Sequence, residues 1–124
     1  LGWCEQDTTW EQTWEKIIEK YGHYHRVHTI NNALLVLMGL LHSGGDMRQA
    51  IAISVMGGLD TDCNGATAGS VMGALLGEAG VPKDLSEPLN DTLEVSLSGM
   101  GLLRISDLVE RTLEMGETTP GSAT

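Results

Sequence analysis

Residues 60–63 bring together the side chains of this chain that are best suited to chemistry, two aspartates and a cysteine. Asp60 and Asp62 are two residues apart, so on a regular helix their side chains would diverge by about 200°. They can share an ion only where a helix begins, with Asp60 as N-cap and Asp62 and Cys63 at the second and third helical positions. Carboxylates there favour Mg²⁺, Mn²⁺ or Ca²⁺ over zinc.

Two other interpretations of nearby residues stay open. An aspartate N-cap with an acidic first turn also stabilises a helix dipole without any metal. His23, His25 and His28 lie within six residues and offer a zinc site with Cys63 as fourth ligand. These histidines lack a recognised ligand spacing, and histidines in a connecting loop are more often surface or helix-capping groups.

The elements expected to position residues 60–63, the acidic turn, are helices. An apolar stripe predicts a helix over 7–21, with a capping box of Thr8 and Glu11 and a left-handed stop at Gly22. Further helices are expected over 33–41, over 47–56 with Asp46 as cap, and over 60–77. The last of these carries a glycine at every fourth position, at a cost of about 1 kcal/mol each, which close approach of neighbouring helices would offset: Gly65, Gly69, Gly73 and Gly77.

The sequence pattern of the C-terminal third predicts its secondary structure less completely. Leu93, Val95 and Leu97 alternate as in a strand, but residues 85–100 also suit a short irregular helix. A last amphipathic helix is expected from about Ile105, capped by Ser106. The predicted fold is therefore all-α, a compact bundle of about five helices in a single domain over 1–115, with a disordered tail over 116–124.

Composition narrows the classes of partner. The 124 residues carry a formal charge of −10, which disfavours nucleic acid and anionic membrane surfaces. Two cysteines are too few for a disulfide framework, and the longest apolar runs fall short of the roughly 20 residues that span a bilayer. We expect a cytoplasmic protein.

The string GGLDTDCNGATAGSVMGALLG at 57–77 closely resembles the C-terminal metal-binding motif of the ADP-ribosylglycohydrolase family, of the dinitrogenase reductase-activating glycohydrolase type. The likeness extends upstream through HTINNALLVLMGLLHSGGDMRQAIAISVM and downstream to VPKDL and ISDLVERTLEM, covering most of 24–115. It implies an all-α enzyme that uses two Mg²⁺ ions, or Mn²⁺, to hydrolyse the bond between the anomeric carbon of ADP-ribose and an acceptor.

The same resemblance suggests roles for single residues. Asp60 and Asp62 would be metal ligands, with Asp62 the better candidate for a bridge. Cys63 stands where the family usually has Thr or Ser, and a thiol is a poor ligand for Mg²⁺. Contacts to an ADP-ribose-containing ligand or ADP-ribosylated substrate are expected from residues before and after the motif, although the last two also suit local capping and packing: His28, Asn31, Asn32, Asn64 and Thr67.

One part of the family pattern is missing. The family draws its other metal ligands, a Thr-Asp-Asp cluster, and its catalytic acidic residue from an N-terminal half, and no such cluster occurs in these 124 residues. No catalytic residue is identified. Half of a dinuclear site is a weak metal site, so we expect no turnover by the isolated chain, in which Mg²⁺ or Mn²⁺ need not be bound. Either an N-terminal half or a partner completes the hydrolase, or the chain is a catalytically inactive module that acts as a homodimeric binding or assembly domain.

Overall fold

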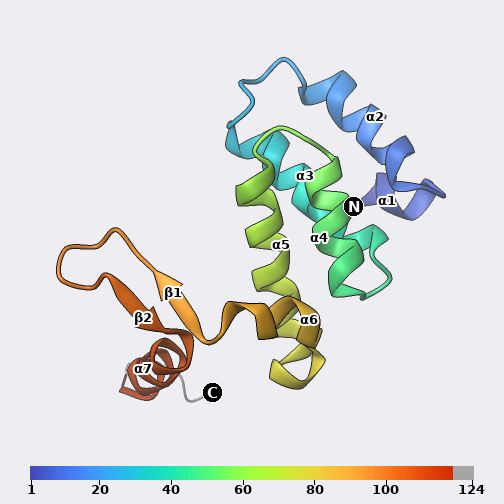
Figure 1. The fold of residues 1–124 in the computed structure, drawn as a ribbon. Coiled ribbons are helices and arrows are strands. Elements are labelled where there is room, and N and C mark those ends of the chain that lie inside the picture. The colour runs from blue at the N-terminus through green and yellow to red at the C-terminus, as the bar shows by residue number, and fades with distance from the viewer. Residues whose placement is uncertain (119–124) are drawn as a thin grey trace. The chain divides into compact units, whose positions relative to one another are not determined.

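The computed structural model describes residues 1–118, and these form seven α-helices, two 3₁₀ turns and one small hairpin (Figure 1). The predicted all-α class is confirmed. The chain divides into two compact units, 1–81 and 82–124, where the sequence predicts one helical domain. Within the described part of the chain, no helix has the length and apolar character needed to cross a membrane.

The first unit is a helical bundle built around a central helix, α3. This helix packs against α2, α4 and α5, and α4 also packs against α5 (Figure 1). Ile17, Leu35, Met38 and Ile53 form the buried core, and three tryptophans of the first 14 residues pack around it. The bounds in this unit are α1 Gly2–Gln6, α2 Trp10–Tyr21, α3 Thr29–His42, α4 Met47–Met56, α5 Thr61–Leu76 and the 3₁₀ turn η1 Glu78–Gly80.

The ends of α2 differ from the prediction. Its capping box joins Thr9 and Gln12 rather than Thr8 and Glu11, because the helix begins one residue later than expected and the Gln12 amide oxygen accepts from the Thr9 backbone N–H. Gly22 ends the helix in a right-handed conformation, with φ −65°, and not in the predicted left-handed one. The prediction of Asp46 as the cap of α4 is confirmed, since its carboxylate accepts from the Gln49 N–H at 2.8 Å.

The glycine series of α5 serves close packing only in its first half. A Cβ at Gly65 would lie 2.9 Å from the Val55 side chain on α4, and one at Gly69 would make ordinary contact with Ile51. A Cβ at Gly73 or Gly77 would meet nothing within 4 Å. The close-packed part of the glycine series is therefore shorter than predicted. The second half of the series lies past the part of α5 that packs against α4.

The second unit is small and has both kinds of secondary structure. The stretch left open at 85–100 contains the end of a helix and a short strand, β1, which pairs antiparallel with β2 so that Leu93 lies opposite Leu103. The bounds are α6 Lys83–Ser86, the 3₁₀ turn η2 Glu87–Leu89, β1 Thr92–Glu94, β2 Leu102–Arg104 and α7 Ile105–Thr118.

The start of α7 is held by a residue from outside the helix. Asp91 accepts from the Ser106 backbone N–H and from the Ser106 hydroxyl, both at 2.7 Å, and from Arg104 Nε at 3.0 Å. Ser106 is thus not the cap that the sequence predicts, since its hydroxyl donates to Asp91. The helix continues to Thr118, past the predicted start of the tail at 116, and residues 119–124 of that prediction lie outside the described residues.

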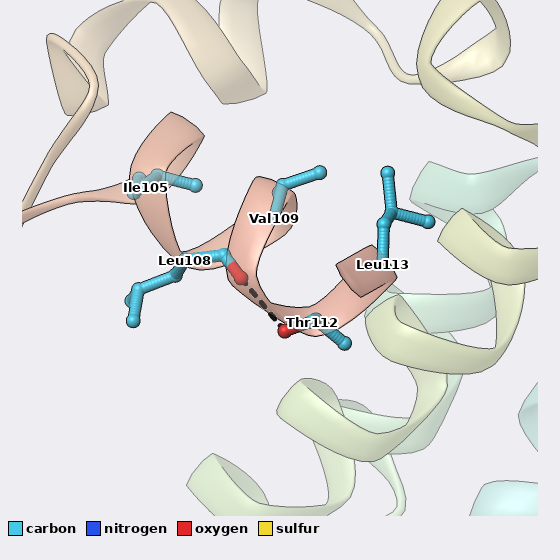
Figure 2. A pocket seen from close by; sticks show the side chains of 5 residues that line it. All are labelled: Ile105, Leu108, Val109, Thr112 and Leu113. Carbon is cyan, nitrogen blue, oxygen red and sulfur yellow. Dashed lines mark hydrogen bonds between the residues drawn. The ribbon is translucent and has the colours of Figure 1, made fainter. Parts of the chain in front are cut away.

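One face of α7 is apolar and accessible. Figure 2 shows Ile105, Leu108, Val109 and Leu113 along it, with the Thr112 hydroxyl donating to the Leu108 carbonyl at 2.7 Å. Val109 and Leu113 are 53% and 63% exposed. No side chain described between 82 and 116 is fully buried, so this unit has no closed core among these residues.

Candidate metal centre

The acidic turn is produced by the unusual backbone that joins α4 to α5. Gly58 and Leu59 both have positive φ, 84° and 62°, and the left-handed conformation is uncommon for a leucine. Helix α5 then begins at Thr61, which places Asp60 at the N-cap and Asp62 and Cys63 at the second and third positions. These helical positions are the ones predicted from the sequence.

The three candidate ligands converge at this turn. A carboxylate oxygen of Asp60, one of Asp62 and the sulfur of Cys63 all lie within 4.8 Å of one another. Asp60 is half-buried, and Asp62 and Cys63 are exposed. In the region that the structure describes, no other three His, Cys, Asp or Glu side chains are grouped closely enough to hold an ion.

The Asp60 carboxylate is not used as a helix cap. It makes no side-chain hydrogen bond to the free N–H groups of α5, although it stands at the N-cap position. A capping role without metal would require that bond. The Asp60 carboxylate instead accepts from the Cys63 thiol, while its charge still lies at the positive end of the helix dipole.

The Cys63 thiol interacts with both acids. A hydrogen bond to the Asp60 carboxylate, and the negative charges of Asp60 and Asp62, raise the pKa of this thiol. It therefore stays protonated at neutral pH and donates to Asp60. The lower rank that the sequence gives Cys63 as a ligand rests on the poor match of sulfur with Mg²⁺ and stays a prediction.

A hollow of about 560 Å³ lies between α3 and α5 and includes the acidic turn. Asp60, Cys63 and Thr67 contribute polar groups to it. Its other walls are mainly apolar and come from α3 and α5 and the loop before α3, through Val27, Ala33, Val36, Leu37, Leu40 and Val71. A mainly apolar hollow with a few polar groups gathered in it is typical of a small-molecule site.

The predicted substrate-binding asparagines are buried and bonded to protein. Asn31 is fully buried, and its amide donates to the His25 carbonyl at 3.2 Å, so it is unavailable to a ligand. Asn32 and Asn64 line the hollow, but Asn64 Nδ2 donates to Asn32 Oδ1 at 2.9 Å. The Thr67 hydroxyl donates to the Cys63 carbonyl at 2.8 Å and lies on the wall of the hollow.

The histidines serve local structure. His28 is the N-cap of α3, with Nδ1 accepting from the Ile30 N–H at 3.2 Å, and its ring stacks on Tyr24 at 4.5 Å. The His23 ring packs against Tyr24 at 4.2 Å, and His25 Nδ1 accepts from the Val27 N–H. The zinc interpretation is wrong for the described residues, because these histidines do not gather with Cys63 into a group able to hold a metal.

Two contacts that fix the acidic turn could not be read from the sequence. The Trp14 indole N–H donates to the Gly57 carbonyl at 2.8 Å, from a residue 43 positions away. The Asp60 backbone N–H donates to Asn32 Oδ1 at 3.1 Å, across 28 positions. No local pattern marks either pair, since each depends on how α2 and α3 pack beside the turn.

Comparisons with known proteins agree with the motif. A family model described as ADP-ribosylglycohydrolase matches residues 3–120, which is nearly the whole chain. Comparisons with the curated proteins and with the solved structures give no match.

Proposed function

Because the chain belongs to the ADP-ribosylglycohydrolase family, we propose that it forms part of a Mg²⁺- or Mn²⁺-dependent hydrolase for the N-glycosidic bond of an ADP-ribosyl group. The observation that carries the proposal is the convergence of the Asp60 and Asp62 carboxylates at the start of α5. Its ligand would be an ADP-ribose-containing molecule or an ADP-ribosylated substrate, and we propose a cytoplasmic location.

The donor groups fit a hard cation. Two carboxylates stand at a helix start, where Asp60 makes no capping bond to the backbone of α5 and accepts from the Cys63 thiol. Carboxylate oxygens suit Mg²⁺ and Mn²⁺, whereas a single protonated thiol adds little for either ion. Asp60 and Asp62 would therefore hold the ion, and Cys63 would remain a hydrogen-bond donor to Asp60.

The chain's own residues would bind and orient the sugar. A bound cation supplies electrostatic stabilisation of ribose hydroxyls and of a water molecule as the glycosidic bond breaks. The apolar side chains of α3 that line the hollow would exclude bulk water from the same region. Thr67, on the wall one turn along α5 from Cys63, would face the ligand. None of these groups supplies a general acid or base.

Two carboxylates make an incomplete site for Mg²⁺. Octahedral coordination needs further oxygen donors, and the described residues bring no third carboxylate to the turn. We therefore propose that a complementing N-terminal half, or a partner, supplies the remaining ligands and the catalytic acid. On this proposal the isolated chain releases no ADP-ribose from an ADP-ribosylated arginine substrate with Mg²⁺ present, and measurable release would contradict it.

Direct metal binding tests the proposal. Mn²⁺ titrated into the full chain and followed by electron paramagnetic resonance should show one saturable site, which Asp62→Ala abolishes. Asp107→Ala is the matched control, because it also removes an acid from the first turn of a helix and stands outside the cluster. Equal binding by the wild type and Asp62→Ala would contradict the assignment.

A second candidate function follows from exposed apolar side chains on the first unit. Leu37 and Leu41 on α3 are 45% and 47% exposed, and Val71 and Leu75 on α5 are 45% and 70% exposed. Such a surface favours association, so we propose as the alternative a catalytically inactive, homodimeric binding module. Sedimentation equilibrium separates the two: a stable dimer that is indifferent to metal supports the alternative, and a monomer excludes it.

A further inference from the structure

The Asn32 side chain joins three segments of the first unit. Its Oδ1 accepts from the Asp60 backbone N–H at 3.1 Å and from Asn64 Nδ2 at 2.9 Å. Its Nδ2 donates to the carbonyls of Arg26 and His28, at 2.8 Å and 2.9 Å. One amide on α3 thus contacts the acidic turn, the first turn of α5 and the loop before α3.

This set of contacts requires an amide of this length. The side-chain carbonyl uses both of its lone pairs and the NH₂ group uses both of its hydrogens, so the hydrogen-bonding capacity of Asn32 is filled. A carboxylate in its place would keep the two acceptor contacts but would face two carbonyl oxygens without a proton to give them. A shorter or apolar side chain would leave the Asp60 N–H without its acceptor in a site that is only 8% exposed at Asn32.

The contacts bear directly on where the Asp60 carboxylate lies. Asp60 has an irregular backbone, with φ −96° and ψ 68°, and its side chain makes no capping bond that would fix it. The turn is held by side chains at both ends, by Trp14 at the Gly57 carbonyl and by Asn32 at the Asp60 N–H. Of these two contacts, the Asn32 contact is the one that acts on Asp60, whose carbonyl also accepts from the Asn64 backbone N–H at 2.9 Å.

We propose that Asn32 is a positioning residue of the metal site and not a substrate contact. It acts through Asp60, whose backbone it fixes, and it ties that position to the Arg26–His28 loop. Val27 of this loop lines the same hollow as Asp60, so one side chain contacts both the metal turn and a second segment that lines the hollow. The metal part of this inference rests on the proposed function, and the hydrogen-bonding part does not.

Amide hydrogen exchange by NMR on the full chain tests the hydrogen-bonding part without any metal. Asn32→Ala should speed exchange at the Asp60 amide about tenfold, the equivalent of one lost hydrogen bond, and leave Leu35 in the core protected. The matched control is Asn31→Ala, since Asn31 is also buried on α3 and donates to the His25 carbonyl; its Oδ1 accepts from the Asn32 N–H and from Asn32 Nδ2, so this variant disturbs Asn32 without removing either of its acceptor contacts to Asp60 and Asn64. Unchanged exchange at Asp60, or equal acceleration in both variants, would overturn the proposal.

A second variant covers the case in which Asn32→Ala does not fold. Asn32→Asp is isosteric and keeps the acceptor for the Asp60 N–H but repels the loop carbonyls. We expect the Asp60 amide to stay protected, while the amide of His28, which donates to the His25 carbonyl at 2.8 Å, exchanges faster. Equal acceleration at both amides would overturn the proposal, because the two contacts would then not be separable.

Mn²⁺ affinity provides the functional arm. Loss of the positioning contact should weaken binding about tenfold in Asn32→Ala, the lower end of what outer-sphere partners contribute, and leave Asn31→Ala close to wild type. If wild type binds Mn²⁺ and folded Asn32→Ala binds equally well, the positioning role is refuted and the metal site stands. If wild type binds no Mn²⁺, the assignment of Asp60 and Asp62 as a metal site of this chain alone fails, and the exchange data alone decide whether Asn32 fixes the turn.

Discussion

Cys63 lies beside Asp60 and Asp62 in the acidic turn, at a position where an oxygen-bearing side chain could act as a third hard ligand. Its sulfur lies within 4.8 Å of both carboxylates, and its proton is held by Asp60. A thiol in this position favours softer ions and contributes little to Mg²⁺. We therefore expect a substitution at position 63 to change which metal ion the turn prefers. Its effect on the overall affinity of the turn for divalent ions should be smaller.

Replacement of Cys63 by serine tests this at the residue scale. Cys63→Ser exchanges a soft sulfur for a hard oxygen that can still donate to Asp60, so we expect the preference for Mg²⁺ over Cd²⁺ to rise, on the order of tenfold, because Cd²⁺ loses a soft donor. Competition between the two ions, read against bound Mn²⁺, measures the ratio. Cys4→Ser, at the other free cysteine, is the control and should leave it unchanged. An unchanged ratio in Cys63→Ser would show that the sulfur does not face the ion.

Single residues of the site were predictable where their neighbours in sequence determine them. The convergence of Asp60 and Asp62 follows from a helix start, and the residues on either side of the turn mark that start. The asparagines were assigned to substrate because of the resemblance, yet Asn31 and Asn32 bond to backbone that only the folded loop brings near. Residue type alone does not reveal that an amide already has partners.

At the scale of elements, some helical glycines lie where two helices pack closely, whereas others lie in a helix with no neighbour near them. Gly39 on α3 is the tightest approach, because a Cβ there would lie 2.0 Å from Ser54 Oγ and 2.7 Å from the Ala50 carbonyl oxygen. No sequence pattern marks this close approach, since Gly39 is a lone glycine in an apolar run. Close helix packing was predicted for the regular glycine series in α5 instead, and half of that series faces open space.

A pair of alanine substitutions measures the difference. Gly39→Ala should lower the free energy of unfolding by about 1–3 kcal/mol, because α3 and α4 must separate to admit the methyl group. Gly73→Ala, in the interior of α5 with nothing near its Cβ position, should raise it by about 0.5–1 kcal/mol through reduced backbone entropy. Urea denaturation followed by circular dichroism gives both values. Destabilisation by Gly73→Ala would mean that α5 is covered there.

The hairpin of the second unit was hard to predict for a related reason. Its strands are three residues long, and their pairing and the start of α7 depend on Asp91, which lies 15 positions before the Ser106 amide it accepts from. Hydrogen bonds from the Ser106 hydroxyl and backbone, and the nearby Arg104, lower the pKa of Asp91. Apolar alternation at 93–97 indicated a strand but contained no information on this distant cap.

The Asp91 contacts predict a pH dependence for this element. Because its pKa is lower in the folded than in the unfolded state, Asp91 stabilises the hairpin and α7 above its usual pKa of 3.8, and this contribution is lost as pH falls through the lowered value. The protection factor of the Val95 amide, which donates to the Gly101 carbonyl, should therefore fall below about pH 4, after the observed exchange rate is corrected for the intrinsic rate at each pH. Asp91→Asn should remove that dependence, whereas Asp107→Asn should retain it. A profile in Asp91→Asn identical to wild type would contradict the role of Asp91.

On the scale of the whole molecule, the two units differ in how much of their apolar surface is buried. The first unit has a core that includes fully buried Leu35 and Met38, and both helices that form the candidate site pack on it. The second unit exposes Leu102 to 71% and Leu113 to 63%. The metal turn thus belongs to the better-packed unit, which suits a site that must hold two carboxylates in place.

The contrast predicts separate opening of the two units in the full chain. Regions with few buried apolar contacts open at lower free energy, so peptides from 82–116 should exchange their amide hydrogens within seconds to minutes while those from 29–56 stay protected far longer. Hydrogen exchange followed by mass spectrometry measures this directly. Adding Mn²⁺ should slow exchange at 57–65 and leave 82–116 unchanged, because the candidate ligands all lie in the first unit. Equal protection of both units would mean that they unfold together, and the acidic turn would then draw its stability from the whole chain.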